Sequence, residues 1–224
     1  MSNRYTHTGG WGVAEEIEAL EGSADAYSAQ VVADAAGNAI AVWIQRTTES
    51  EPHVAANVLT AGVGWGDAEL MTDVGYPAEL RLAMSANGSA FAVWSDMPDQ
   101  DHVRVWARPY VFGSGWGAAE IINDTGIPCI DEYLAFPSAE CLPQISMDAG
   151  GGAVVVWRGS GENFQIRANR FVPGEGWGSD EALSGGGATD PRVAADAAGN
   201  YLAIWRVDGG PQHTIWAARY TPSG

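Results

Sequence analysis

The sequence predicts an all-β fold assembled from one structural unit that is used four times. The tripeptide GWG recurs at spacings of 54, 51 and 61 residues, with its tryptophans at Trp11, Trp65, Trp116 and Trp177. A second tryptophan ends an apolar run in each unit, at Trp43, Trp94, Trp157 and Trp205. Two independent landmarks with one shared period define an internal repeat, and such a repeat decides the fold before any local pattern does.

Each unit contains four short segments with the composition of strands. In the first unit these are residues 30–34, 39–45, 53–59 and 66–72, and the turn DAAGN joins the first two. The segments are rich in β-branched and aromatic residues and are bounded by Gly, Pro, Asn and Asp. No segment has a convincing helical pattern. Four antiparallel strands in a unit of this length predict one blade of a β-propeller, and the alternative is a two-sheet sandwich.

The expected architecture is a single four-bladed propeller domain over residues 1–224. The blades are expected at residues 28–72, 79–123 and 142–184, with three strands of the last blade at 191–220 and an insertion at 124–141. Arg4-Tyr5 and Arg219-Tyr220 mark the same point of the repeat, so residues 1–20 are expected to form the outer strand that closes the last blade. The alternatives are a piece of a longer array, or two chains that share a larger ring.

The pattern GWG…AE…P-x-V-x-x-D-x-x-G-N-x-x-A-V-W…RY resembles tandem repeats of bacterial secreted and surface proteins with β-propeller folds. The resemblance covers nearly the whole chain. It implies a propeller that is similar to propeller lectins. It specifies the function poorly, because propellers serve as lectins, hydrolases, lyases and scaffolds.

Composition excludes several classes of partner. The chain has 28 acidic and 11 basic residues, a formal net charge of −17, and no lysine. A nucleic-acid surface needs basic charge, so we expect no nucleic-acid partner. No apolar run approaches the length of a membrane span. The histidines lack metal-ligand spacing, so neither a metal nor a cofactor is expected.

The insertion holds both cysteines of the chain, Cys129 and Cys141. Two cysteines twelve apart in one loop predict a disulfide, and therefore a secreted or periplasmic protein. The alternative is a pair of free thiols in a cytosolic protein. Tyr133 and Phe136 lie in the same loop and are candidates for stacking on a ligand.

Ligand-binding candidates are the positions at which polar or aromatic residues vary between units. The starts of the first strands carry Gln30, Arg81, Gln144 and Arg192, and we expect them to form a donor-rich collar at the mouth of a central channel. The alternative is that they pair with acids such as Glu79 and Asp190. Further candidates follow the second-strand tryptophans or lie in the third strands: Arg158, Arg206, Trp106 and Trp216.

Three functions are compatible with these features. The first is a binding module for carbohydrate or a small anionic ligand. The second is a hydrolase or lyase that holds an anionic substrate with the channel arginines, although no catalytic residue can be assigned. The third is a structural propeller of a surface protein or of a homo-oligomer.

Overall fold

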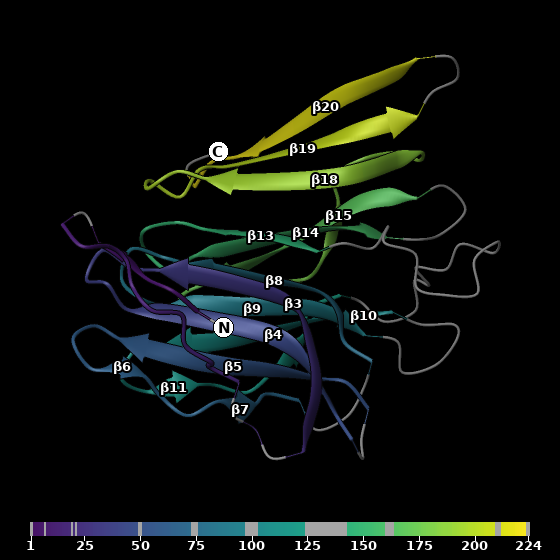
Figure 1. Ribbon diagram of the computed structural model, residues 1–224. Helices are drawn as coiled ribbons and strands as arrows, with labels where there is room; N and C mark the ends of the chain where they lie inside the picture. The colour runs from purple at the N-terminus through teal and green to yellow at the C-terminus, as the bar shows by residue number, and fades with distance from the viewer. Residues whose placement is uncertain are drawn as a thin grey trace. The chain divides into compact units, whose positions relative to one another are not determined.

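A computed structural model describes residues 2–6, 8–18, 20, 22–48, 51–72, 76–96, 103–123, 143–159, 164–208 and 212–222. Every regular element in these ranges is a β-strand, so the predicted all-β class is confirmed (Figure 1). No helix in the described part of the chain could cross a membrane. The chain divides into two compact units, Met1–Gly75 and Tyr76–Gly224, which we describe separately.

Unit 1 contains one hairpin and one larger sheet. The hairpin consists of β1 (Tyr5–Thr6) and β2 (Gly10–Trp11). The larger sheet, here called sheet 1, is antiparallel in the order β3-β4-β5-β6, and β7 also pairs with β5. Its strands are β3 (Ser23–Ala33), β4 (Ala39–Thr47), β5 (His53–Thr60), β6 (Gly64–Trp65) and β7 (Glu69–Leu70).

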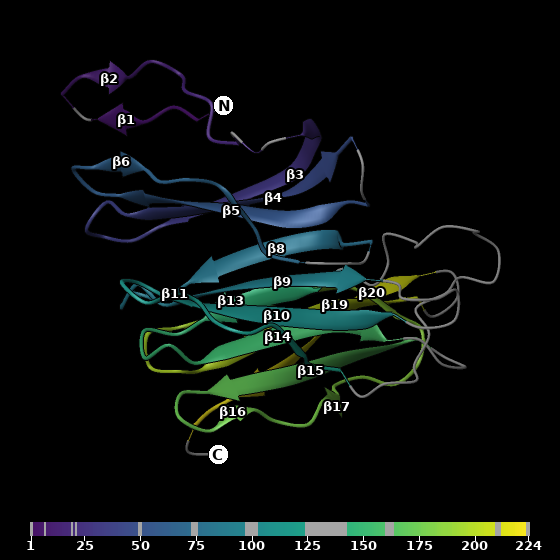
Figure 2. The same ribbon diagram turned by 90° about the horizontal axis from the view of Figure 1, so that it is seen from below.

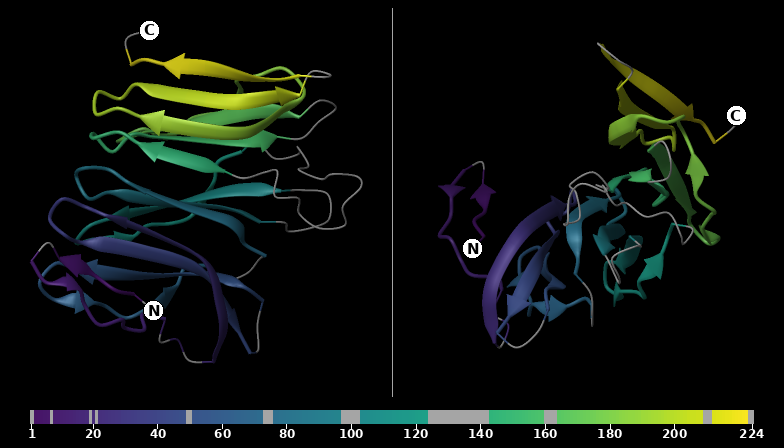
Figure 3. Two further views of the ribbon diagram at one scale, coloured as in Figure 1. Left: turned by 45° about the horizontal axis from the view of Figure 1, so that its top comes forward. Right: turned by 90° about the vertical axis from the view of Figure 1, so that its right-hand side faces the viewer.

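Unit 2 contains three antiparallel sheets with the same strand order (Figure 2). Sheet 2 is β8 (Ala78–Met84), β9 (Ala90–Asp96), β10 (Arg104–Val111), β11 (Gly115–Trp116) and β12 (Glu120–Ile121). Sheet 3 is β13 (Gln144–Met147), β14 (Ala153–Gly159), β15 (Gln165–Val172), β16 (Gly176–Trp177) and β17 (Glu181–Ala182). Sheet 4 is β18 (Ala188–Ala195), β19 (Tyr201–Asp208) and β20 (His213–Tyr220) (Figure 3).

The sequence predicts a continuous fourth strand in each repeat, and the structure differs from this prediction. In sheet 1 the fourth strand is split, because Trp65 pairs with Leu59 while Leu70 pairs with Ala55. These two pairings are out of step by one residue, so the chain inserts an extra residue and the ladder breaks between β6 and β7. Sheets 2 and 3 contain the same interruption.

The turn between the first and second strands is held by its aspartate. The Asp34 carboxylate accepts hydrogen bonds from the Asn38 backbone N–H and side-chain Nδ2, at 2.9 and 2.7 Å. Asp196 and Asn200 repeat both bonds in sheet 4. The asparagine side-chain bond is the main cause that lowers the pKa of both aspartates. Gly37 has φ of 89°, a conformation that side-chain-bearing residues rarely adopt.

The core of unit 2 lies between neighbouring sheets. One cluster joins Phe91 and Val93 of sheet 2 to Val155 and Trp157 of sheet 3. A second joins sheet 3 to sheet 4 and contains Trp205. The second-strand tryptophans Trp157 and Trp205 therefore fill the space between neighbouring sheets of unit 2.

A polar contact also links sheets 3 and 4. The Tyr201 hydroxyl donates a hydrogen bond to Asp148, which lies in the first turn of sheet 3, at 2.8 Å. Burial, and next this hydrogen bond, raise the pKa of Tyr201. The phenol therefore stays protonated and remains a donor.

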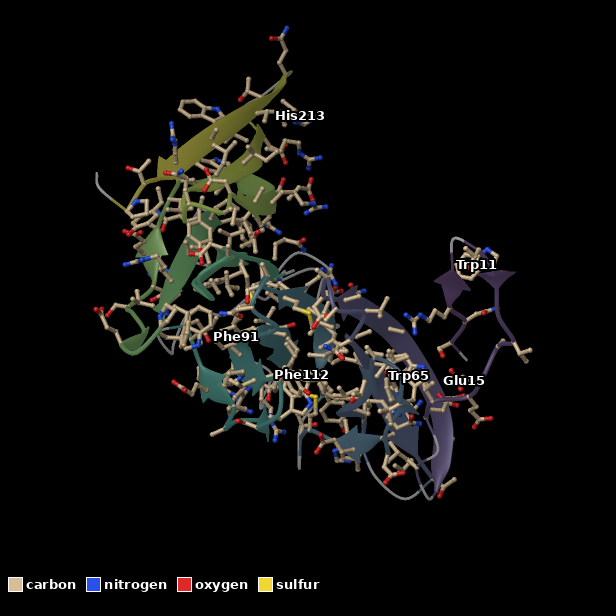
Figure 4. All side chains as sticks on the ribbon, turned by 90° about the vertical axis from the view of Figure 1, so that its left-hand side faces the viewer. Trp11, Glu15, Trp65, Phe91, Phe112 and His213 are labelled. Atoms are coloured by element: carbon tan, nitrogen blue, oxygen red, sulfur yellow. The ribbon has the colours of Figure 1, made fainter. Side chains whose placement is uncertain are left out.

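Replacing Phe91 should test the apolar contact between sheets 2 and 3. Phe91 meets Phe171 and Trp177 edge-on, with ring centroids 4.8 and 5.3 Å away. We expect Phe91→Ala to lower the free energy of unfolding by about 3–5 kcal/mol, because it leaves a cavity in a packed core. Urea denaturation followed by tryptophan fluorescence measures this. Phe112→Ala, at an exposed turn position, is the control and should have little effect (Figure 4).

Candidate ligand-binding rim

The first strand carries a bulge at the same repeat position in sheets 1, 2 and 4. Ser28, Glu79 and Asp190 adopt positive φ values of 56°, 54° and 53°. The ladder register shifts at the same places in β3, β8 and β18. Bulges re-aim side chains and are frequent beside functional sites. Positive φ in residues other than glycine costs energy, so the surrounding structure must hold this conformation.

The collar residues follow these bulges and fold back onto them. Gln30, Arg81 and Arg192 each donate a side-chain hydrogen bond to the carbonyl of the preceding residue, at 3.1, 2.8 and 2.7 Å. This bond ties the tip of each side chain to the backbone. An arginine has five N–H donors, so one backbone bond leaves most of the guanidinium able to bind a ligand.

Unit 2 brings three of the four predicted collar residues onto neighbouring strands. β13 lies beside both β8 and β18. Arg81, Gln144 and Arg192 pair with Val93, Val156 and Ile204, which occupy one repeat position. We call these three residues the rim. Gln30 occupies the same position in unit 1.

Acidic residues at the bulges partly neutralise the arginines. The Glu79 carboxylate lies 3.7 Å from the Arg81 guanidinium, as expected if the collar arginines pair with neighbouring acids. Burial raises the pKa of Glu79, and the positive charge of Arg81 partly opposes this. Asp190 instead pairs with Arg206, at 3.2 Å, and Arg206 also binds Asp208. Arg192 is exposed and donates its hydrogen bond to the Pro191 carbonyl, at the bulge.

The remaining described candidates have other surroundings. Arg158 is buried, with its guanidinium carbon 3.8 Å from the centre of the Phe164 ring. Trp106 stacks on Trp94 with a centroid distance of 6.3 Å. Trp216 is exposed, and its indole N–H donates to Thr214. Cys129, Cys141, Tyr133 and Phe136 lie outside the described residues.

Sequence reasoning missed a cavity of about 500 Å³ between sheets 3 and 4. Its lining includes Val154, Arg170, Trp177, Arg219 and Tyr220. The Arg170 guanidinium lies over the Tyr220 ring, at 4.6 Å. A comparison of the repeats could have indicated this cavity, because the small Val154 occupies the repeat position that holds the larger Phe91 in sheet 2.

Known structures share the fold. No family model matches the chain, and no curated protein matches it. The Hadza microbial sialidase Hz136 is similar over 85% of this chain and 43% of its own, with a TM-score of 0.55 and 10% identity. The GH93 α-L-arabinofuranosidase of Fusarium graminearum is similar over 91% and 65%, with a TM-score of 0.53 and 13% identity. The chain thus spans less than two thirds of either protein's length and shares a β-propeller fold with them.

Removing Arg81 should change the ionisation of Glu79. We expect Arg81→Met to raise the pKa of Glu79 further, because the cation that favours the carboxylate is lost while burial remains. A carbon-detected NMR titration of the glutamate side chains measures this pKa. Arg108→Met, on β10, should leave the Glu79 titration unchanged. An unchanged or lowered value in Arg81→Met would contradict the pairing.

Proposed function

We propose that this protein is a carbohydrate-binding module whose rim recognises a sugar that carries a carboxylate. The observation that carries the proposal is the placement of Arg81, Gln144 and Arg192 at one repeat position of three neighbouring strands. Each of the four repeats supplies one blade. The named activities of the two similar structures, a sialidase and an arabinofuranosidase, support a sugar as the ligand class.

The rim chemistry suits an acidic sugar. A guanidinium binds a carboxylate through two parallel hydrogen bonds. The Gln144 amide can both donate to and accept from a hydroxyl. The backbone bonds of Arg81 and Arg192 reduce the side-chain freedom that binding would otherwise remove.

The insertion at 124–141 extends the same proposal. It enters the first strand of sheet 3 just before Gln144, so Tyr133 and Phe136 would stack on a ligand at the rim. We propose that Cys129 and Cys141 form a disulfide within this loop. A secreted or periplasmic location follows from that bond.

Binding of acidic sugars tests the rim directly. We expect N-acetylneuraminic acid or galacturonic acid to bind in titration calorimetry, and the double variant Arg81→Ala/Arg192→Ala to weaken binding about tenfold or more. Binding should also weaken as pH rises through the elevated pKa of Glu79, because the rim then gains a negative charge. Arg108→Ala is the matched control. Equal affinity of the double variant and the control would refute the proposal.

A second function, glycoside hydrolysis, is favoured by Glu79 and by the enzymatic activity of both similar structures. A half-buried carboxyl with a raised pKa is suited to donate a proton to a leaving group. Asp190 occupies the equivalent bulge and is a candidate for the second carboxylate.

Turnover separates this enzyme from a simple binding module. If the protein cleaves sialosides or arabinosides, we expect Glu79→Gln to reduce kcat at least a hundredfold with little change in KM. Release of reducing sugar measures it, and Glu175→Gln, away from the rim, is the control. A protein that binds acidic sugars and releases none from either substrate class would be a binding module alone.

A further inference from the structure

The outer face of sheet 4 has the composition of a buried contact. Leu202, Ile204 and Ile215 are 47%, 39% and 71% exposed. The same repeat positions of sheet 2 are only 3%, 0% and 1% exposed, because sheet 3 packs against that face, and they are occupied by Phe91, Val93 and Val105. Sheet 4 therefore presents an apolar face that another sheet of the same kind would fit.

The cavity beside sheet 4 lies where the repeat elsewhere places a tryptophan. In sheet 3, the fourth-strand Trp177 contacts Phe91 and Phe171, with centroid distances of 5.3 and 5.5 Å. Val154 and Tyr220 hold the repeat positions of Phe91 and Phe171, and both line the cavity. In the described residues, sheet 4 contains no fourth strand. The cavity is thus shaped to receive a GWG tryptophan.

Unit 1 presents a GWG strand whose tryptophan is exposed. Trp11 is 69% exposed and projects from the β1–β2 hairpin, apart from Trp65 of sheet 1 (Figure 4). Its strand, residues 10–20, pairs with residues 2–6 in the register that the repeat uses between third and fourth strands. The Arg4 carbonyl accepts from the Gly12 N–H at 2.9 Å, as the Arg170 carbonyl does from Gly178 at 3.0 Å.

Residues 2–6 are a copy of the end of β20. They read SNRYT, and residues 217–221 read AARYT. Ser2 bridges to Glu15, and the repeat register assigns Ala217 to the same partner. Residues 2–6 and β20 are therefore alternative partners for one strand.

The 10–20 strand is also fixed to a sheet face that would complete the contact. Ile17 and Leu20 pack against Trp43 of sheet 1. The Ile17 carbonyl accepts a hydrogen bond from Asn57, as the Ile122 carbonyl of sheet 2 does from Asn169 of sheet 3. Sheet 1 and this strand thus reproduce the contact that sheet 3 makes with the end of sheet 2.

Charge favours the same pairing. The strand carries three acidic residues, Glu15, Glu16 and Glu18. The receiving edge carries Arg219 on β20, and Arg170 lines the adjoining cavity. In a chain of net charge −17, these local pairs of opposite charge favour this register over others.

We propose that sheet 4 of one copy binds the 10–20 strand and sheet 1 of a second copy. The strand adds to the edge of β20, Trp11 enters the cavity, and residues 2–6 of the second copy are displaced. Since unit 1 carries the strand and unit 2 carries the receiving edge, each copy offers both halves of a head-to-tail contact. The proposal does not rest on sugar binding at the rim, but Arg192 pairs with Ile204 and therefore lies on the same face of sheet 4.

Cross-linking between two differently labelled copies tests the register. In one variant Glu15 is replaced by cysteine, and in the other Ala217; directly opposed strand residues are close enough for a disulfide. We expect the mixture, under mild oxidation, to yield a 15–217 linked dimer, identified by peptide mass. Val63→Cys, at an exposed turn, replaces Glu15→Cys as the control. A yield no higher than in the control would overturn the proposal. So would a third variant with both cysteines in one chain, if it forms the 15–217 link only within that chain.

Association of the full chain gives a second measurement. By analytical ultracentrifugation we expect Trp11→Ala to raise the dissociation constant at least about tenfold, and deletion of residues 2–6 to lower it. Val13→Ala, on the same strand, should change nothing. A protein that stays monomeric at every concentration, including the deletion variant, would overturn the proposal and leave rim binding untouched.

Discussion

The structure of unit 2 depends on apolar packing between successive sheets. A single antiparallel sheet of this size has two faces and cannot bury both by itself. Sheet 3 solves this by placing Val155 and Trp157 against sheet 2 and Val154 and Val156 against sheet 4. Its second strand is therefore apolar on both faces, which explains the run of valines before Trp157 in the sequence.

This constraint also explains where polar chemistry is found. The sheet faces are occupied by packing, so charged side chains gather where strands begin or end. The bulges at Glu79 and Asp190 lie at such a place, and they turn Arg81 and Arg192 back onto the backbone. The rim arginines are therefore held in place by the strands β8 and β18.

The sequence predicted the repeat and the strand class, because both depend on local residue pattern. GWG, D-x-x-G-N and the A-V-W runs mark fixed points of every unit. The split fourth strand was not predictable, since it arises from a one-residue offset in pairing with β5. Spacing alone could not show that Asp190 pairs with Arg206 or that Arg158 lies over Phe164, because such contacts depend on side-chain conformation. The cavity was missed because it is a property of two packed sheets.

The hydrogen bond from Tyr201 to Asp148 affects how sheets 3 and 4 unfold. It joins the hairpin of one sheet to the second strand of the next, beside the apolar cluster they share. Losing sheet 3 therefore leaves the Tyr201 phenol without this acceptor, and losing sheet 4 removes one of the hydrogen bonds of the Asp148 carboxylate. In a chain of repeated modules, stability is a sum of intrinsic terms and nearest-neighbour terms. Links of this kind enlarge the neighbour term, so disorder that begins in sheet 4 would spread into sheet 3 as one cooperative event.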